Sequence, residues 1–241
     1  MNTNAILLAG GTGSRLGGSI PKQYREIGGK PMIYYSLQVL MEHVGIETVR
    51  IVADESWHVF ILDSIDNAEW KKKFSGFSKP GENRQISIRN ALEDMKKELT
   101  AETDKNAGVL IHDAARPFLS CELLDRLMAA IDGNDGVLPV LPMKDTVYYS
   151  EDGKCVSSLL NRSKVLAGQA PELFNYAKYW EANNCLSLDE MLQINGSTEP
   201  AVKAGMKIAF VEGDEQNFKV TTEADWLRAK EVIEKSTSGN K

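Results

Sequence analysis

Short apolar runs alternate with longer amphipathic stretches along this chain, which is the pattern of parallel strands covered by helices. The runs that predict strands are bounded by Gly, Pro or Asp and cover residues 4–8, 48–53, 108–112, 136–141 and 207–212. The stretches that predict helices cover residues 32–43, 56–65, 84–99, 122–131 and 222–234. The alternation predicts a three-layer α/β fold around a mostly parallel sheet.

One segment departs from this alternation. Residues 146–150 and 155–160 are two β-prone runs on either side of Glu151-Asp152-Gly153, a connection typical of a hairpin. We therefore predict a β-arm at 146–164, inserted into one domain formed by 1–145 and 165–235. The hairpin either protrudes to cover a partner subunit or packs on the edge of its own domain.

The end of the chain carries a helix start signal. Thr222 is followed three residues later by Asp225, which resembles a capping box with Asp in place of the usual Glu. Residues 236–241 beyond this helix are polar and small, and we expect them to form a frayed tail.

Composition narrows the class of protein. The chain has 241 residues, of which 42% are apolar and 26% charged, as in ordinary globular domains. No apolar run approaches the roughly 20 residues of a membrane span, and the start does not resemble a signal peptide. The three cysteines are far apart, which disfavours a disulfide framework or zinc site and fits a reducing cytoplasm.

The net charge of −6 argues against nucleic acid or an anionic membrane as a partner. The charge is nevertheless uneven, because residues 1–30 carry four basic side chains and one acidic side chain, a local charge of +3. Positive charge near the N-terminus favours a small anion bound in one pocket rather than a polyanion spread over a surface.

The most informative stretch is the glycine-rich loop at residues 8–17, Leu-Ala-Gly-Gly-Thr-Gly-Ser-Arg-Leu-Gly, with Pro21-Lys22-Gln23 after it. Such a loop after a strand lets backbone N–H groups converge on phosphate. A P-loop would end in Gly-Lys-Ser/Thr, and a dinucleotide fingerprint would have two residues between its last glycines, where this loop has three. Nucleotidyl transfer requires positive charge at the α-phosphate and at the leaving pyrophosphate, which Arg15 and Lys22 could supply. The alternative is a β–α turn whose basic side chains are solvated.

This loop resembles the signature of the sugar-nucleotide pyrophosphorylases. With Pro-Lys-Gln-Tyr after it, the chain resembles the polyol-phosphate cytidylyltransferases, which activate 2-C-methyl-D-erythritol 4-phosphate or ribitol 5-phosphate. Further motifs follow in the family's order: Pro-Gly-Glu-Asn-Arg at 80–84 with Ser87, His-Asp-Ala-Ala-Arg-Pro at 112–117, Lys-Asp-Thr at 144–146, Asn-Arg at 161–162, and Asn-Phe-Lys-Val-Thr-Thr at 217–222. The resemblance covers nearly the whole chain.

The resemblance implies a Rossmann-like nucleotidyltransferase fold whose arm supports a homodimer, with CTP and a polyol phosphate as substrates and Mg²⁺ as cofactor. It implies CTP-binding roles for Ala9, Gly10, Gly11, Thr12, Gly13, Arg15, Lys22, Gly81, Glu82, Ser87 and Asp113. Arg15, Lys22 and Lys219 are the implied catalytic residues. Arg116, Thr146, Arg162 and Lys219 are the implied acceptor-binding residues.

Asp113 also has a direct physical interpretation. It ends an apolar strand, where open parallel sheets present ligand-contacting groups, and a carboxylate there suits Mg²⁺. The alternative is that Asp113 caps the turn before Pro117.

Three stretches depart from the family pattern. Ala170-Pro171-Glu172 replaces Thr-Pro-Gln, and a carboxylate at this point would repel an incoming phosphate. Glu199-Pro200 changes an acidic stretch, and Gln216 stands where an acidic or small polar residue is usual. All three lie toward the acceptor side. Methylerythritol phosphate is the first choice of acceptor, ribitol phosphate or another polyol phosphate the alternative, and a nucleotide-binding regulator without turnover a third hypothesis.

Overall fold

The computed structural model describes residues 1–11, 20–65, 67–100 and 106–238. Within these residues a mixed sheet has the strand order β10-β7-β11-β6-β1-β4-β5, and β12 pairs with β7. Its strands are β1 (Asn2–Leu8), β4 (Ile46–Val52), β5 (Phe74–Ser78), β6 (Ala107–Asp113), β7 (Gly136–Pro142), β10 (Leu166–Gly168), β11 (Glu172–Asn175) and β12 (Ile208–Glu212). The predicted mostly parallel sheet is confirmed.

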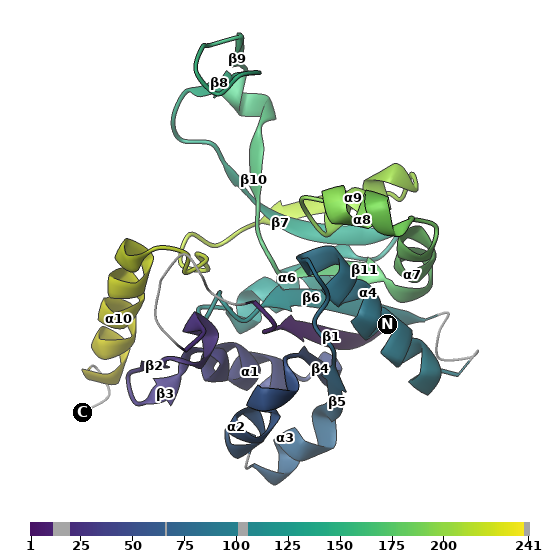
Figure 1. The fold of residues 1–241 in the computed structure, drawn as a ribbon, viewed down its shortest axis with the longest axis vertical. Helices are drawn as coiled ribbons and strands as arrows, with labels where there is room; N and C mark the ends of the chain where they lie inside the picture. Colours follow the sequence, from purple (N-terminus) through teal and green to yellow (C-terminus); the bar gives the residue numbers. More distant parts are fainter. Residues whose placement is uncertain (12–19, 66, 101–105, 239–241) are drawn as a thin grey trace.

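Helices cover both faces of the sheet (Figure 1). They are α1 (Met32–Glu42), α2 (His58–Asp63), α3 (Ala68–Lys73), α4 (Arg84–Glu98), α6 (Cys121–Ala130), α7 (Tyr176–Asn184), α8 (Leu188–Gln193), α9 (Thr198–Lys203) and α10 (Glu223–Ser238). Short 3-10 turns η2 (Lys22–Tyr24), η3 (Glu55–Trp57) and η4 (Arg162–Lys164) connect them. A two-stranded ribbon joins β2 (Glu26–Ile27) to β3 (Lys30–Pro31).

Alternation along β1 divides the core into two layers. Ala5 and Leu7 face the cluster that contains α1 and α6, whereas Ile6 faces the cluster that contains α4 and α7. Because successive side chains of a strand point to opposite faces, a strand buried on both sides is apolar at every position. The three predicted layers follow from this arrangement.

The predicted elements are present with small shifts of their ends, and the helix predicted at 56–65 is instead η3 followed by α2. Strands β5 and β10 and helices α3, α7, α8 and α9 were not predicted, and neither was strand β11. It is antiparallel to both β6 and β7, between which it lies, and four residues are too few to give a clear pattern.

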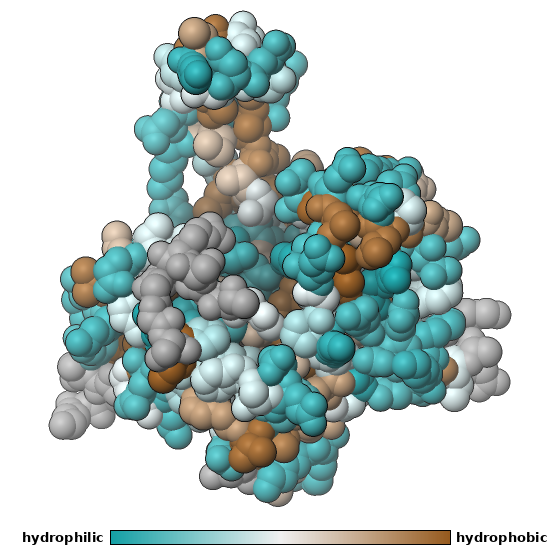
Figure 2. Space-filling view, viewed as in Figure 1, coloured by the Kyte–Doolittle hydropathy of each residue, from teal (hydrophilic) through white to brown (hydrophobic). Residues whose placement is uncertain are grey.

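The arm leaves the sheet as a hairpin in which β8 (Val147–Tyr149) is antiparallel to β9 (Ser158–Leu160). It stands away from the domain at the top of Figure 1, so it does not pack on the edge of its own sheet. Its exposed apolar side chains include Tyr148, Val156 and Leu159, the last two about two-thirds exposed. Apolar residues are visible along the arm in Figure 2.

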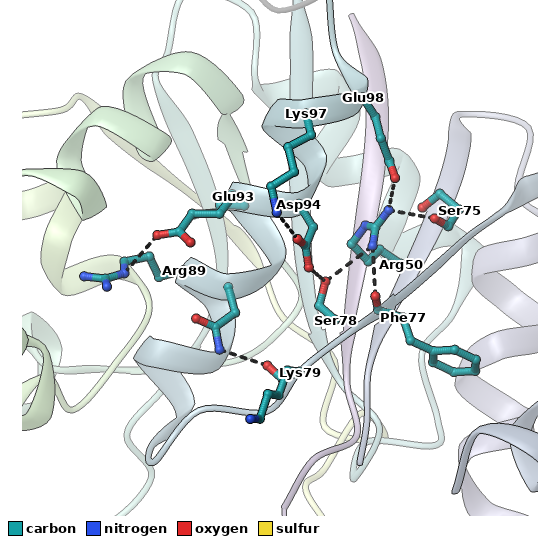
Figure 3. A network of polar contacts seen from close by, with 12 residues as sticks. Arg50, Ser75, Phe77, Ser78, Lys79, Arg89, Glu93, Asp94, Lys97 and Glu98 are labelled. Carbon is teal, nitrogen blue, oxygen red and sulfur yellow. Dashed lines mark hydrogen bonds and ion pairs between the residues drawn. The ribbon is translucent and has the colours of Figure 1, made fainter. Parts of the chain in front are cut away.

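A buried arginine ties the edge of the sheet to α4 (Figure 3). Arg50 of β4 is 4% exposed and donates to the carbonyls of Ser75 and Phe77, at 2.6 and 3.1 Å, while pairing with Glu98. Ser78 Oγ then donates to Asp94 Oδ2 at 2.8 Å. These bonds fix β5 against α4, so the segment that joins them has both of its ends anchored.

Helix α10 begins at the predicted capping box. Asp225 N–H donates to Thr222 Oγ1 at 3.2 Å, and Thr222 N–H donates to Asp225 Oδ2 at 2.8 Å. The helix continues to Ser238, so residues 236–238 are helical rather than part of a frayed tail. In the part of the chain that the structure describes, every helix is too short or too polar to cross a lipid bilayer.

We expect Asp225→Ala to lower the free energy of unfolding by about 1 kcal/mol at pH 7, as for other lost helix caps. Burial opposes ionisation, but hydrogen bonds from Thr221 and Thr222 outweigh it and lower the pKa of Asp225 to about 2. The unfolded value is about 3.9. The stabilisation is therefore complete above about pH 4 and is lost as the pH falls through 2.

Urea unfolding at pH 7, 4 and 2 measures this difference. Glu231→Ala removes an exposed carboxylate from the same helix and serves as the matched control. Equal losses in the two variants, or a loss for Asp225→Ala that does not diminish at pH 2, would contradict the role of the cap.

Candidate functional site

A cavity of about 410 Å³ opens at the carboxyl ends of β1 and β6, beside the N-terminus of α4. The last residues of the two strands, Leu8 and Asp113, are parallel partners in register. The lining residues come from five segments: Leu8, Gly10, Gly11, Lys22, Gln23, Gly81, Glu82, Asn83, Arg84, Ser87, Asp113, Ala115 and Lys219. Ligands of open α/β sheets bind at this end of the strands.

The start of the glycine-rich loop is held by side chains that follow it. Gln23 Nε2 donates to the carbonyls of Ala9 and Gly11, both at 2.6 Å, and Tyr24 Oη donates to Ala9 O at 2.8 Å. A Cβ on Gly10 would lie 2.7 Å from Pro80. Glycine at position 10 therefore permits the close packing of the loop against the opposite wall. The predicted residues Thr12, Gly13 and Arg15 lie outside the described residues.

The opposite wall is the N-terminus of α4. Asn83 caps the helix by accepting from Ile86 N–H at 2.9 Å. Gly81 N–H donates to Ser87 Oγ at 2.9 Å, and Ser87 Oγ donates to Asn83 O at 2.8 Å. This network fixes the backbone around Gly81, Glu82 and Ser87. A wall that recognises a planar ligand needs polar groups held in fixed positions, as these are.

Asp113 lies at the centre of the charged groups. Its Oδ1 accepts from Arg84 Nε at 3.0 Å, and its Oδ2 accepts from Lys219 Nζ at 2.8 Å. Burial alone would raise the pKa of this carboxyl, but the two cations outweigh that effect and hold the pKa well below its usual range. Asp113 is therefore an anion at neutral pH.

Glu172, the acidic departure at the start of β11, contacts the same arginine. Its Oε2 lies 3.6 Å from Arg84 Nη2 and also accepts a hydrogen bond from Ser197 Oγ. Burial raises the pKa of Glu172 above its ordinary value, although Arg84 and Ser197 act in the opposite direction. The side chain is 12% exposed and does not line the cavity. Glu172 therefore contacts Arg84, a cation of the protein, and not the cavity itself.

The segment that carries Lys219 is fastened to the domain by main-chain and side-chain bonds. Val220 N–H donates to Ala115 O at 2.8 Å, and Val220 O accepts from Lys22 Nζ at 2.6 Å. Arg116 Nη1 donates to Asn217 O at 2.7 Å. The predicted residues Lys22, Asp113 and Lys219 are thus brought to one cavity.

Other predicted residues do not line it. Ala9 is buried beneath the loop, and Arg116 donates to the Asn217 carbonyl, while Arg84 is the arginine that contacts Asp113. Thr146 and Arg162 are exposed on the arm, where Arg162 Nη1 donates to Lys144 O at 2.9 Å. Their assigned roles stay predictions.

Sequence reasoning missed Arg84 as a site residue. It stood as the first residue of an amphipathic helix, where an exposed arginine is ordinary. Its place in the Pro-Gly-Glu-Asn-Arg motif beside Gly81 and Glu82 was the available signal. Leu8, Gln23, Asn83 and Ala115 were also missed as lining residues.

His112 precedes Asp113 but cannot act as an acid near neutral pH. It is fully buried, burial lowers its pKa to about 4, and its Nε2 lies 3.1 Å from Arg116 O. The neutral imidazole is a buried positioning group.

The donors available to a metal ion are few. Among the described residues, no group of three or more His, Cys, Asp or Glu side chains could enclose a cation. The cavity lining has the carboxylates of Glu82 and Asp113. Mg²⁺ commonly binds one or two carboxylates together with phosphates and water. Asp113 therefore fits a magnesium ion that a ligand's phosphates help to bind, and each of its oxygens keeps a second lone pair.

Comparison with known proteins identifies related sequences. The family model described as IspD, 2-C-methyl-D-erythritol 4-phosphate cytidylyltransferase, matches residues 3–235. A protein of that name from Cereibacter sphaeroides is 32% identical, and the match covers 97% of each chain. A bifunctional enzyme IspD/IspF from Rhodopseudomonas palustris is 31% identical over 94% of this chain, which spans about half (54%) of that longer relative.

Solved structures share the fold. The 4-diphosphocytidyl-2C-methyl-D-erythritol synthase of Anaerococcus prevotii superposes with a TM-score of 0.78 at 23% identity, covering 96% of this chain and 98% of its own. The 2-C-methyl-D-erythritol 4-phosphate cytidylyltransferase of Francisella tularensis gives 0.76 at 23% identity, covering 95% and 98%. The arrangement of strands and helices is thus shared over almost the entire length.

We expect Gly81→Ala to lower the free energy of unfolding by about 1 to 3 kcal/mol, as overpacking does. The added Cβ would lie 2.8 Å from the backbone carbonyl carbon of Ile86, which cannot move without shifting α4. The control is Gly196→Ala, because no described atom lies within 4 Å of that Cβ position. Urea unfolding of both variants checks the expectation, which fails if they have equal stability.

Proposed function

Because the chain belongs to the 2-C-methyl-D-erythritol 4-phosphate cytidylyltransferase family, we propose that it transfers CMP from CTP to 2-C-methyl-D-erythritol 4-phosphate and releases pyrophosphate. The observation that carries the proposal is the cavity in which Lys22, Arg84 and Lys219 surround the carboxyl end of β6. Three cationic side chains at the end of a parallel sheet suit a triphosphate.

In this reaction the phosphate of the acceptor attacks the α-phosphorus of CTP in line with the departing pyrophosphate. The acceptor phosphate is already ionised near neutral pH, so no side chain has to remove a proton. His112 is fully buried and is not among the residues that line the cavity, which agrees with a site that needs no general base. Catalysis then consists of positioning and of neutralising charge at the α-phosphate and pyrophosphate, which we assign to Lys22 and, from the family resemblance, to Arg15.

The cytosine is assigned to the wall formed by Gly81, Glu82 and Ser87. Gly81 N–H and Ser87 Oγ are fixed by their mutual hydrogen bond, so their geometry is set before a base arrives. Backbone groups and a hydroxyl in a fixed arrangement can distinguish the exocyclic amine and carbonyl of cytosine from those of other bases.

Magnesium is the cofactor we assign to Asp113. When bound, the ion would supply positive charge to the phosphates of CTP. Asp113 is ionised and shared between Arg84 and Lys219, so the protein contributes one carboxylate ligand and two neighbouring cations.

The acceptor phosphate is assigned to Lys219 and Arg116 of one subunit and to Thr146 and Arg162 on the arm of the other, in a homodimer. The exposed position of Arg162 and the exposed apolar side chains of the arm support this arrangement, because apolar patches of this kind are typical of interfaces. Each site would then require residues from two chains.

The cytoplasm is the compartment we propose for the reaction. Cys121, Cys155 and Cys185 are exposed free thiols, which persist in a reducing environment.

The experiment that tests the proposal is pyrophosphate release from CTP and Mg²⁺ with the phosphates of methylerythritol, ribitol, erythritol and glycerol. We expect methylerythritol phosphate to give the highest kcat/KM. Lys22→Ala should lower kcat by about 10² to 10³ if it stabilises the transition state. A ribitol phosphate preference would indicate the alternative acceptor. CTP binding without release for any acceptor would indicate a regulator.

A second prediction concerns the shared site. Arg162→Ala and Lys219→Ala should each be nearly inactive alone. Mixed dimers contain one complete site if the arm reaches the partner's cavity, so an equal mixture after refolding should regain about a quarter of the parent's activity. The parent protein taken through the same refolding is the control. If the mixture is no more active than the variants alone, the arm does not serve the partner.

A further inference from the structure

The two cations that face Asp113 are anchored differently. Arg84 is the first residue of α4, and its guanidinium lies between two carboxylates: Nε is on Asp113 and Nη2 is near Glu172. Lys219 Nζ makes its hydrogen bond with Asp113 Oδ2, and its flexible side chain is 35% exposed beside the cavity. Among the residues that the structure describes, Arg84 therefore contacts two carboxylates and Lys219 contacts one.

Glu172 is itself fixed on the buried side of this arrangement. Its strand β11 is paired with β6, where Glu172 is opposite Ile111, two residues before Asp113. Its carboxylate accepts from the hydroxyl of Ser197, which is fully buried at the start of α9. The pairing and the hydrogen bond together give Glu172 little freedom to follow Arg84 toward the cavity.

Two carboxylates and two cations are in direct contact here, and Arg116 is near enough to act electrostatically on both carboxylates. Phosphates of substrates bound in the cavity would attract both cations, and loss of both would leave the buried Asp113 without a direct ion-pair partner among the described residues. A buried carboxylate in that state strongly destabilises the folded protein. Glu172, the second carboxylate that contacts Arg84, prevents this loss. Arg84 would have to leave two carboxylates to reach the phosphates, whereas Lys219 would leave one, so Arg84 gains less than Lys219 by moving.

We propose that Glu172 is a positioning residue that keeps Arg84 on Asp113, so that Lys219 is the cation that moves to the phosphates. This inference rests on the proposed function, since it requires a phosphate ligand in the cavity. The sequence predicted that the carboxylate at position 172 would repel an incoming phosphate, and the contact with Arg84 gives Glu172 a different role. Glu172 acts on the ligand through Arg84 and not by repelling the phosphate directly.

The test is a double-mutant cycle on the affinity for inorganic pyrophosphate, measured by calorimetry without metal. Glu172→Gln keeps the size of the side chain and its ability to accept from Ser197, but removes the charge that holds Arg84. We expect it to bind pyrophosphate about 5- to 10-fold more tightly, because Arg84 becomes available to the ligand. In an Arg84→Gln background, the same substitution should change the affinity less than 2-fold.

Direct repulsion gives a different result. A carboxylate that repels the phosphate through space would give Glu172→Gln the same gain in both backgrounds, and that outcome overturns the proposal. No gain in either background overturns it as well. A merely structural role for Glu172 would lower the affinity and the melting temperature together, and that result also contradicts the proposal.

Ser197→Ala keeps the test decisive if Arg84→Gln does not fold. This variant leaves all four charges in place and removes the hydrogen bond that anchors Glu172, so we expect a 2- to 4-fold gain in pyrophosphate affinity. An unchanged affinity would favour direct repulsion and overturn the proposal. If the parent protein binds neither pyrophosphate nor CTP, the proposed function fails; if it binds both and the variants match it, only the role of Glu172 fails.

Discussion

The site depends on one buried carboxylate that must be neutralised. Asp113 is 7% exposed at the end of a strand that is buried along its whole length, and an unpaired charge there would be costly. The two groups that compensate it lie 29 and 106 residues away in the sequence. This fold compensates Asp113 by bringing the N-terminus of α4 and the segment before α10 to the end of β6.

Much of the surrounding structure positions these two cations. The Asn83 cap and the hydrogen bond from Ser78 of β5 to Asp94 of α4 hold the helix that begins with Arg84. The bonds that Lys22 and Ala115 make to Val220, and the bond from Arg116 to Asn217, hold the segment on which Lys219 stands. Arg116 thus has a structural task whatever it contacts in a complex. The site is assembled by contacts that are mostly remote from any substrate.

The sequence was informative where local chemistry determines the outcome. Alternation of apolar runs predicted the strands, and the spacing of Thr222 and Asp225 predicted the cap of α10, because both patterns report interactions between near neighbours. The first glycines of the loop motif predicted where β1 ends, at Leu8. The pairing of Arg84 with Asp113 and Glu172 could not be read in this way, because it depends on how β11 enters the sheet. That strand is short and reverses the direction set by its neighbours. Of the departures from the family pattern, Glu172 contacts the charged groups at the cavity. Glu199 instead accepts a hydrogen bond from Asn195 N–H, just before its own helix, and forms an ion pair with Lys203 on that helix.

The way the arm is attached to the sheet makes substitutions at its tip different in effect from substitutions at its base. Both ends of the arm are continuous with strands of the main sheet, β7 and β10, and β11 is the single strand between β7 and β6. Substitutions at the tip of the arm alter the surface offered to another chain without disturbing the register of these strands. Substitutions at its base would shift β7 and, through β11, both carboxylates beside Arg84. The tip can therefore vary in sequence with little effect on the cavity, while the base is constrained by the carboxylates beside Arg84.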